Sequence, residues 1–127
     1  MDTLVVVDGA NVVGSVPDGW WRDRRGAAER LRDELAARAS EGVAGYRPVE
    51  IVLVVEGAAK GVESVPGVRV VPAPGSGDDC IVEQVAAEAP RRHCVVVTAD
   101  RELRRRVEAS GAECVGPRAV RGSDKRE

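Results

Sequence analysis

Acidic residues stand directly after three apolar segments of this sequence. Asp8 follows Leu4–Val7, Asp100 follows a second valine run, and the pair Asp78 and Asp79 follows a stretch rich in valine and proline. If these segments are parallel strands of one sheet, the carboxylates meet at its carboxyl edge, where open α/β folds place their chemistry. Carboxylates that meet without a basic partner need a cation. The spacing therefore predicts a metal site of the kind used in phosphodiester cleavage.

The segment Gly75–Glu83 adds further acidic groups at the start of a predicted helix. Asp79 and Glu83 are four residues apart, so both carboxylates lie on one helix face and repel each other unless a positive charge is near. Mg²⁺ and Mn²⁺ take oxygen ligands and keep several waters, so a few aspartates suffice without histidine. The three cysteines form no C-x-x-C pair, which argues against zinc.

Each aspartate also has a local explanation. Asp8, Asp78 and Asp100 could each cap a helix or turn that follows, and the helix dipole favours carboxylates in a first turn. This explanation leaves Glu83 without a role. Independent caps also have no reason to converge at one edge of a sheet, whereas metal ligands must. Both interpretations stay open for each single residue, and the joint pattern favours the metal site.

Strands and helices alternate along the chain in an order that would bring these residues together. Apolar runs without polar alternation are typical of parallel strands covered on both faces. The predicted strands are Leu4–Val7, Val49–Val55, Val68–Val71, Val95–Val97 and a short last one, Glu113–Val115. Helical periodicity runs from about Arg22 to Ser40, after Gly77, and from near Asp100 to Gly111. The pattern predicts an α/β fold, a doubly wound parallel sheet with helices on both faces.

The length of 127 residues predicts one domain. We expect it to span residues 1–117, followed by a charged, mobile tail over residues 118–127. The sequence predicts neither a membrane span nor a secretory signal, so no membrane partner is expected. The odd number of cysteines suits a reducing compartment, and we place the protein in the cytoplasm.

The charge distribution indicates how a nucleic acid could be bound. The net charge of −2 argues against a uniformly basic surface, but 17 of the 19 basic residues are arginines, whose planar fork suits phosphate. Trp21, Arg22 and Arg25 could bind single-stranded RNA by stacking on bases and contacting phosphates. Alternatively, one of Trp20 and Trp21 anchors the first long helix. Arg101 could contact the scissile phosphate or pair with its acidic neighbour.

Three motifs resemble the NYN/YacP-like branch of the PIN-domain-like ribonucleases. They are V-V-V-D-G-A-N at Val5–Asn11, G-D-D-C-I-V-E at Gly77–Glu83 and V-T-A-D-R at Val97–Arg101, and the resemblance runs from about Leu4 to Pro117. It implies a PIN-like sheet of order 3-2-1-4-5. It also implies a Mg²⁺- or Mn²⁺-dependent endoribonuclease that acts on single-stranded RNA.

The resemblance also assigns roles by position. Asp8, Asp79 and Asp100 match the acidic residues of the metal site, and Glu83 matches an acidic residue one turn into the helix. Asn11 matches the polar residue of the D-G-x-N start. We expect Asn11 to position the substrate or to contact a phosphate as part of the catalytic group.

Other residues complete the predicted site. Asp78 is counted among the metal-site carboxylates, and Thr98 and Ser76 are expected to orient the aspartates by hydrogen bonds. Glu56 ends the second strand where many relatives carry aspartate, and its longer side chain leaves its membership open. Ala10 stands where an aromatic residue is frequent in the family. The sequence leaves open whether one or two ions bind, whether the RNA is free or ribosome-associated, and whether the chain forms a homodimer.

The main alternative is a catalytically silent module of the same fold that binds RNA or a nucleotide. Two other classes fit poorly. A phosphatase of the haloacid dehalogenase type needs a second acid two residues after the first, and Ala10 stands there. A response-regulator receiver needs a late lysine, whereas the two lysines are Lys60 and Lys125.

Overall fold

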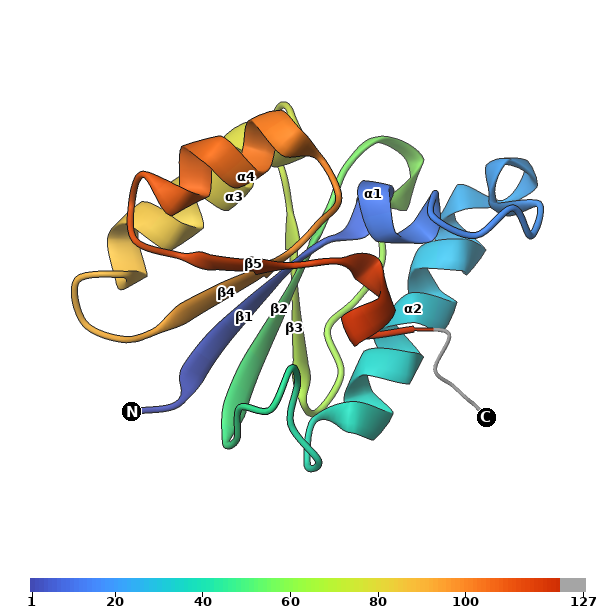
Figure 1. The fold of residues 1–127 in the computed structure, drawn as a ribbon. Helices are drawn as coiled ribbons and strands as arrows, with labels where there is room; N and C mark the ends of the chain where they lie inside the picture. The colour runs from blue at the N-terminus through green and yellow to red at the C-terminus, as the bar shows by residue number, and fades with distance from the viewer. Residues whose placement is uncertain (122–127) are drawn as a thin grey trace.

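The computed structural model describes residues 1–121 and shows one parallel sheet with helices on both sides (Figure 1). Within these residues the strands are β1 (Thr3–Asp8), β2 (Val49–Val55), β3 (Val68–Pro72), β4 (Cys94–Val97) and β5 (Glu113–Val115). They lie in the order β3-β2-β1-β4-β5, and all pairings are parallel. The predicted fold class and strand order are confirmed.

Helices cover both faces of the sheet. They are α1 (Gly9–Val13), α2 (Arg24–Arg38), α3 (Gly77–Glu88) and α4 (Arg101–Glu108), with 3₁₀ turns η1 (Trp20–Arg22), η2 (Gly57–Ala59) and η3 (Pro117–Ala119). In Figure 1, α3 and α4 lie on one side of the sheet, and α1 and α2 lie on the other. Among the helices of residues 1–121, none is both long and apolar enough to cross a lipid bilayer.

The central strand β1 contributes to two separate cores. Successive side chains of a strand point to opposite faces of its sheet. Leu4 and Val6 pack in the core beneath α3 and α4, whereas Val5 and Val7 pack in the core beneath α1 and α2. All four side chains are fully buried. This two-sided burial explains the unbroken apolar run, and it fixes the place at which Asp8 leaves the middle of the sheet.

Helix α2 begins two residues later than the periodicity predicts. Asp23 caps the helix, because its side chain accepts a hydrogen bond from the backbone nitrogen of Gly26 at 2.9 Å. A capping residue has non-helical backbone angles, so it separates the helix from the residues before it. The preceding residues form η1 instead, and this short turn places Trp20 and Trp21 ahead of the helix.

The folded part of the chain continues beyond Pro117, where we expected the domain to end. Val120 is fully buried in the core beneath α1 and α2. Arg121 pairs with Asp18 at 3.4 Å and donates a hydrogen bond to a backbone carbonyl of α1. Burial of Val120 together with the ion pair and hydrogen bond of Arg121 makes residues 118–121, which we assigned to the tail, part of the folded chain. The rest of that predicted tail lies outside the described residues.

Candidate active site

Asp8 lies at the carboxyl end of β1 and is only 4% exposed. The chain turns into α1 at Gly9, where a Cβ atom would lie 2.5 Å from the carbonyl oxygen of Val54, so only glycine permits this close approach. One oxygen of Asp8 accepts a hydrogen bond from the backbone nitrogen of Asn11 at 3.5 Å. The other accepts one from the hydroxyl of Thr98 at 2.9 Å. The carboxylate is therefore fixed in orientation from two sides.

Thr98 connects two of the predicted metal ligands. Its hydroxyl donates to Asp8 and accepts a hydrogen bond from the backbone nitrogen of Asp100 at 3.1 Å. The Thr98 side chain is fully buried, and its carbonyl accepts a hydrogen bond from Nε of Arg104 at 2.9 Å. These contacts fix the Asp8 carboxylate and the start of α4 relative to each other. Sequence reasoning missed Arg104, which holds the turn between β4 and α4.

Asn11 and Asp100 fix the relative position of α1 and α4. The side-chain oxygen of Asn11 accepts a hydrogen bond from the backbone nitrogen of Ala99 at 2.8 Å. Asp100 caps α4 by accepting a hydrogen bond from the backbone nitrogen of Leu103 at 3.0 Å. Within residues 1–121 the side-chain nitrogen of Asn11 makes no hydrogen bond, so it is available to a ligand at this edge.

Glu56 and Asp78 complete a group of four carboxylates with Asp8 and Asp100, which we call the acidic cluster. Glu56 follows β2, and its carboxylate approaches the start of α3 so closely that a Cβ atom at Gly77 would lie 2.5 Å from Oε2. Asp78 lies in the first turn of α3. The structure thus brings Glu56 to the site, although its longer side chain left this open in the sequence.

The electrostatics of the acidic cluster show an excess of negative charge. Burial is the main reason why the pKa of Asp8 rises to about 6, and the charges of Asp78 and Glu56 contribute to the rise. The pKa of Asp78 is also raised, first by burial and then by the charges of Asp100 and Glu56. Hydrogen bonds to Asp8 lower its pKa but do not offset these effects. A cation placed among these groups would favour their ionised forms.

Asp79 lies at the margin of the acidic cluster, where its charge contributes to the raised pKa of Asp78 but its own carboxylate is paired with arginine. Its Oδ1 pairs with Arg106 of α4 at 2.9 Å, its side chain is 67% exposed, and the guanidinium lowers its pKa. Each residue of a helix is turned by about 100° from the one before it, so Asp78 faces the cluster when Asp79 faces α4. Ser76 caps α3 by accepting a hydrogen bond from the backbone nitrogen of Asp79 at 3.1 Å. Ser76 thereby positions the turn that carries both aspartates.

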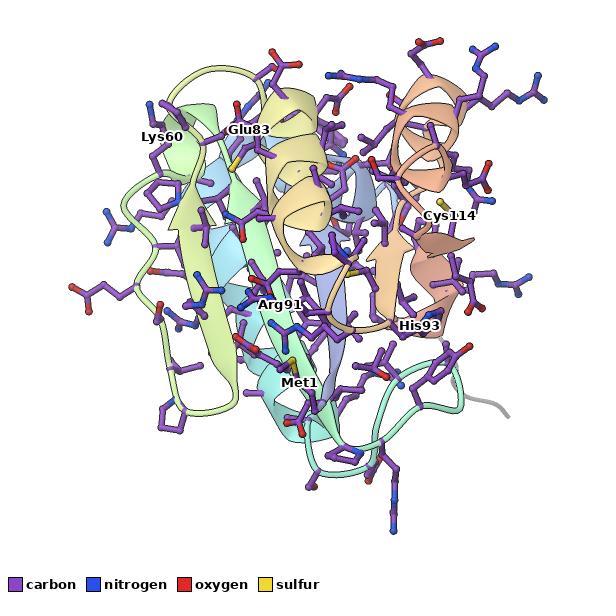
Figure 2. All side chains as sticks on the ribbon, turned by 90° about the vertical axis from the view of Figure 1, so that its left-hand side faces the viewer. Met1, Lys60, Glu83, Arg91, His93 and Cys114 are labelled. Atoms are coloured by element: carbon purple, nitrogen blue, oxygen red, sulfur yellow. The ribbon has the colours of Figure 1, made fainter. Side chains whose placement is uncertain are left out.

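Glu83 is placed outside the acidic cluster. It is exposed on α3, in the upper part of Figure 2. The charges that act on Asp8 and Asp78 come from other residues. Spacing alone put Glu83 and Asp79 on one helix face. In the structure Asp79 pairs with Arg106 of α4, and the charge of Glu83 acts on Cys80.

A family model of the YacP-like NYN domain matches residues 5–125, which is nearly the whole chain. The chain belongs to this family. The predicted recognition is confirmed. A comparison with curated proteins gives no match.

Solved structures show the same fold for this NYN domain. Rae1 (YacP) from Bacillus subtilis is similar with a TM-score of 0.72 at 21% identity, over 94% of this chain and 71% of that chain. The W164L mutant of Rae1 gives a TM-score of 0.69 at 19% identity, over 92% and 70%. At this level of identity the likeness establishes the fold, and the chemistry has to be argued from this chain's own residues.

The residues predicted to bind the substrate are exposed around the NYN domain. Trp21 is 51% exposed, and the guanidinium of Arg22 lies 5.9 Å from the centre of its ring. Arg25 and Arg101 are exposed at the starts of α2 and α4. Trp20 instead is half-buried and packs against the core beneath α1 and α2. The anchoring alternative therefore describes Trp20, and Trp21 remains accessible to a ligand.

A cavity of about 270 Å³ opens beside the acidic cluster, and nothing in the sequence indicated it. We call it the α1–η2 pocket. Its lining consists of Gly9, Ala10, Val13, Trp20, Arg24, Ala28, Val55, Glu56, Gly57, Ala58 and Ala59. Most of these side chains are small or apolar, and only Gly9 and Ala10 belong to a motif noted in the sequence. Only the tertiary structure brings α1, the start of α2 and the end of β2 together.

The acidic cluster fits a hard cation by its chemistry. It offers four carboxylates, and it contains no imidazole or thiol ligand. Within residues 1–121, however, no three acidic, histidine or cysteine side chains are arranged to hold a metal ion as they stand. Asp8 and Asp100 each use one oxygen as a helix cap. A hydrated ion such as Mg²⁺ needs only one or two direct carboxylates, because its own waters reach the others.

Proposed function

We propose that this NYN domain is a metal-dependent endoribonuclease that cleaves single-stranded RNA at the acidic cluster. Membership of a ribonuclease family supports the class of reaction. The observation that carries the proposal is the position of Asp8, a carboxylate that is 4% exposed at the carboxyl edge; burial and then the neighbouring carboxylates raise its pKa. Such an arrangement costs stability in the metal-free chain, and metal binding would recover it.

Asp8, Asp78 and Asp100 would hold Mg²⁺ or Mn²⁺, with Glu56 at the side of the site nearest β2. A bound ion would lower the pKa of its coordinated water, so that a nucleophile forms at neutral pH, and it would stabilise charge on the attacking and leaving oxygens. The chain's contribution is to hold these carboxylates in place. Thr98 does so through its two hydrogen bonds, which set the positions of Asp8 and the first turn of α4.

The groups around the acidic cluster suit an RNA backbone. The side-chain nitrogen of Asn11 can donate to a phosphate oxygen, since its oxygen is held by the backbone nitrogen of Ala99. Arg101 is exposed directly after Asp100 and can add a positive charge near the same phosphate. Trp21, whose ring lies beside that of Trp20, and Arg22 offer a ring and a guanidinium to an unpaired base and its phosphate.

A second function deserves a test because one observation favours it. The acidic cluster has no ready-made three-ligand metal site within residues 1–121. A module that binds RNA or a nucleotide without cleaving it would have the same fold and the same exposed tryptophan and arginines. The two functions differ in whether the RNA is cleaved when a divalent ion is present.

The deciding experiment measures cleavage of end-labelled single-stranded RNA in Mg²⁺, in Mn²⁺ and in excess chelator. We expect cleavage only with the metals, and an Asp8→Asn variant should cut at least about 100-fold more slowly while still binding the RNA. Asp2→Asn, an exposed aspartate at the other end of β1, is the matched control and should cut normally. Cleavage in chelator, or an unaffected Asp8→Asn variant, would contradict the proposal. Unchanged RNA binding without cleavage in any metal would favour the binding module.

A further inference from the structure

The α1–η2 pocket has three walls of different chemistry. One wall is α1, with Ala10 and Val13, and a second is the end of β2 with η2. The third wall carries the ring of Trp20 and the side chain of Arg24, whose guanidinium carbon lies 5.2 Å from the ring centre. The pocket is thus mostly apolar, and it has one aromatic ring, one positive charge from Arg24 and one negative charge from Glu56.

The pocket lies next to the acidic cluster. Glu56 lines the pocket, and its charge also acts on Asp8 and Asp78. Gly9, which lines the pocket as well, directly follows Asp8 in the chain. In Figure 1, α1 and the loop that follows β2 lie side by side at the carboxyl end of the strands. A ligand in the pocket is therefore a neighbour of any phosphate held at the cluster.

The size and lining of the pocket select a small aromatic ligand with a nearby negative charge. Its volume of about 270 Å³ is just below the range of ligand pockets, which span about 300–1,000 Å³. Small apolar residues such as Ala28 and Ala58 leave room for a flat group, and Trp20 offers a ring for stacking. Arg24 can stack on the same group or pair with its phosphate. A single nucleobase with its phosphate meets each of these conditions.

We propose that the α1–η2 pocket binds one unstacked base of the RNA strand, beside the phosphodiester at the acidic cluster. This inference rests on the proposed function, because it takes the base to be part of the RNA substrate. Binding of a base to the pocket does not itself require cleavage. The ring of Trp21 stands at 88° to that of Trp20, with centres 5.9 Å apart. A base on Trp21 and a base in the pocket therefore occupy different planes, which requires a strand whose bases are not stacked on each other.

Nucleoside monophosphates test the pocket without any cleavage step. The probe is the indole N–H signal of Trp20 in two-dimensional NMR, identified by its survival in a Trp21→Phe variant, since the chain has two tryptophans. We expect nucleoside 5′-monophosphates to shift this signal at about tenfold lower concentration than ribose 5-phosphate, which lacks the base. Equal effects of the two probes, or no shift at all, would overturn the proposal.

Filling the pocket gives an independent test. Ala58→Leu and Ala10→Leu add bulk from two different walls, and each should weaken monophosphate binding by about tenfold. Ala37→Leu is the matched control, because Ala37 is exposed on α2 and does not line the pocket. Thermal unfolding checks that each variant is folded. If one of the two filling variants is unfolded, the other one carries the test. Binding that is unchanged in a folded filling variant would overturn the proposal.

The outcomes separate the pocket from the nuclease. A chain that binds monophosphates as described but cuts no RNA would refute the proposed function and support the base pocket. A chain that cuts RNA normally, and whose folded filling variants bind and cut as well as the parent, would refute the base pocket alone. The last experiment compares cleavage of intact RNA with cleavage of RNA that lacks one base. The RNA that lacks the base should be cut more slowly than intact RNA by the parent chain and at the same rate as intact RNA by the filling variants.

Discussion

Two groups of polar side chains lie at opposite edges of the same sheet, and their carboxylates differ in pKa. At the carboxyl edge, burial and neighbouring negative charge raise the pKa of Asp8. At the amino edge, Glu113 accepts a hydrogen bond from the hydroxyl of Tyr46 at 2.6 Å and lies 3.0 Å from Nε2 of His93. These two partners lower the pKa of Glu113. Figure 2 shows His93 in the lower part of the molecule and Lys60, just after η2, in the upper part.

The comparison teaches that partners, rather than residue type, separate a structural carboxylate from a candidate ligand. Glu113 has donors on either side, so it holds the loop before β2 against the starts of β4 and β5 without a cation. Asp8 has one strong donor and several negative neighbours, so its charge is only partly offset. The proposed metal site should therefore lower the stability of the fold until an ion binds and offsets the negative charge.

The largest expected effect is on the rate of RNA cleavage, which should depend on the carboxyl edge of the sheet and not on the amino edge. Asp100→Asn should lower RNA cleavage by at least about 100-fold, because it removes a charge from the acidic cluster while retaining a cap oxygen. Glu113→Gln, the same type of change at the amino edge, should leave the cleavage rate unchanged. Rates under saturating Mg²⁺ measure both. A loss of activity in Glu113→Gln as large as that in Asp100→Asn would remove the distinction between the edges.

The second prediction concerns stability and has opposite signs at the two edges. The pKa of Asp8 is about 6 in the fold against 3.8 for an ordinary aspartate, so the folded chain binds more protons between these values. The free energy of unfolding therefore falls as the pH rises through this window, and the cost persists above it. Without divalent ions, Asp8→Asn should raise the free energy of unfolding by on the order of 2 kcal/mol at about pH 8.

Urea unfolding at about pH 4 and about pH 8 in chelator measures this effect, which should nearly vanish at the lower pH. Glu113 provides the opposite case, since its pKa is lowered in the fold. Its contribution to stability is present above the ordinary pKa of a glutamate and is lost as the pH falls. Glu113→Gln should therefore destabilise the chain at about pH 8. A stabilised Glu113→Gln or a destabilised Asp8→Asn variant would reverse the comparison.

The third prediction contrasts two adjacent residues of α3. Asp78→Asn should lower the cleavage rate by about tenfold, because it removes a carboxylate whose pKa is raised within the acidic cluster. Asp79→Asn should change the rate by less than about threefold, because the carboxylate of Asp79 is paired with Arg106 at the margin of the cluster. Both variants keep the side-chain volume, so each is the control for the other. The reverse ranking would support Asp79 as the metal ligand, as the family resemblance implies.

The smallest effect is expected at the amino edge. Tyr46→Phe removes the hydroxyl that donates to Glu113 and should lower the free energy of unfolding only slightly, because the pair is partly exposed. The cleavage rate should not change. Thermal unfolding and the RNA assay check the two statements. Slower cleavage by a Tyr46→Phe variant of normal stability would mean that the amino edge takes part in the proposed reaction.

The sequence predicted much of this framework from local patterns. Val49–Val55 and Glu113–Val115 were placed as observed, because apolar runs and turn residues report the burial of their own segment. The aspartates after β1 and β4 reached the predicted edge, since the carboxyl ends of parallel strands share one side of a sheet. Thr98 was also expected to orient them by hydrogen bonds. Its hydroxyl donates to Asp8 and accepts from the backbone nitrogen of Asp100, while its role in a reaction stays a prediction.

Other features depended on how the elements pack. Spacing put Asp79 and Glu83 on one helix face, but the rotation of α3 on the sheet directs Asp78, and not Asp79, to the acidic cluster. The approach of Glu56 to Gly77 and the α1–η2 pocket arise from contacts between segments distant in the chain.

The sequence by itself therefore determined the strands, the fold class and the edge where acidic residues collect, because these follow from local burial and chain direction. Tertiary structure alone decided which carboxylates share one environment, since their pKa values depend on distances and burial between separate elements.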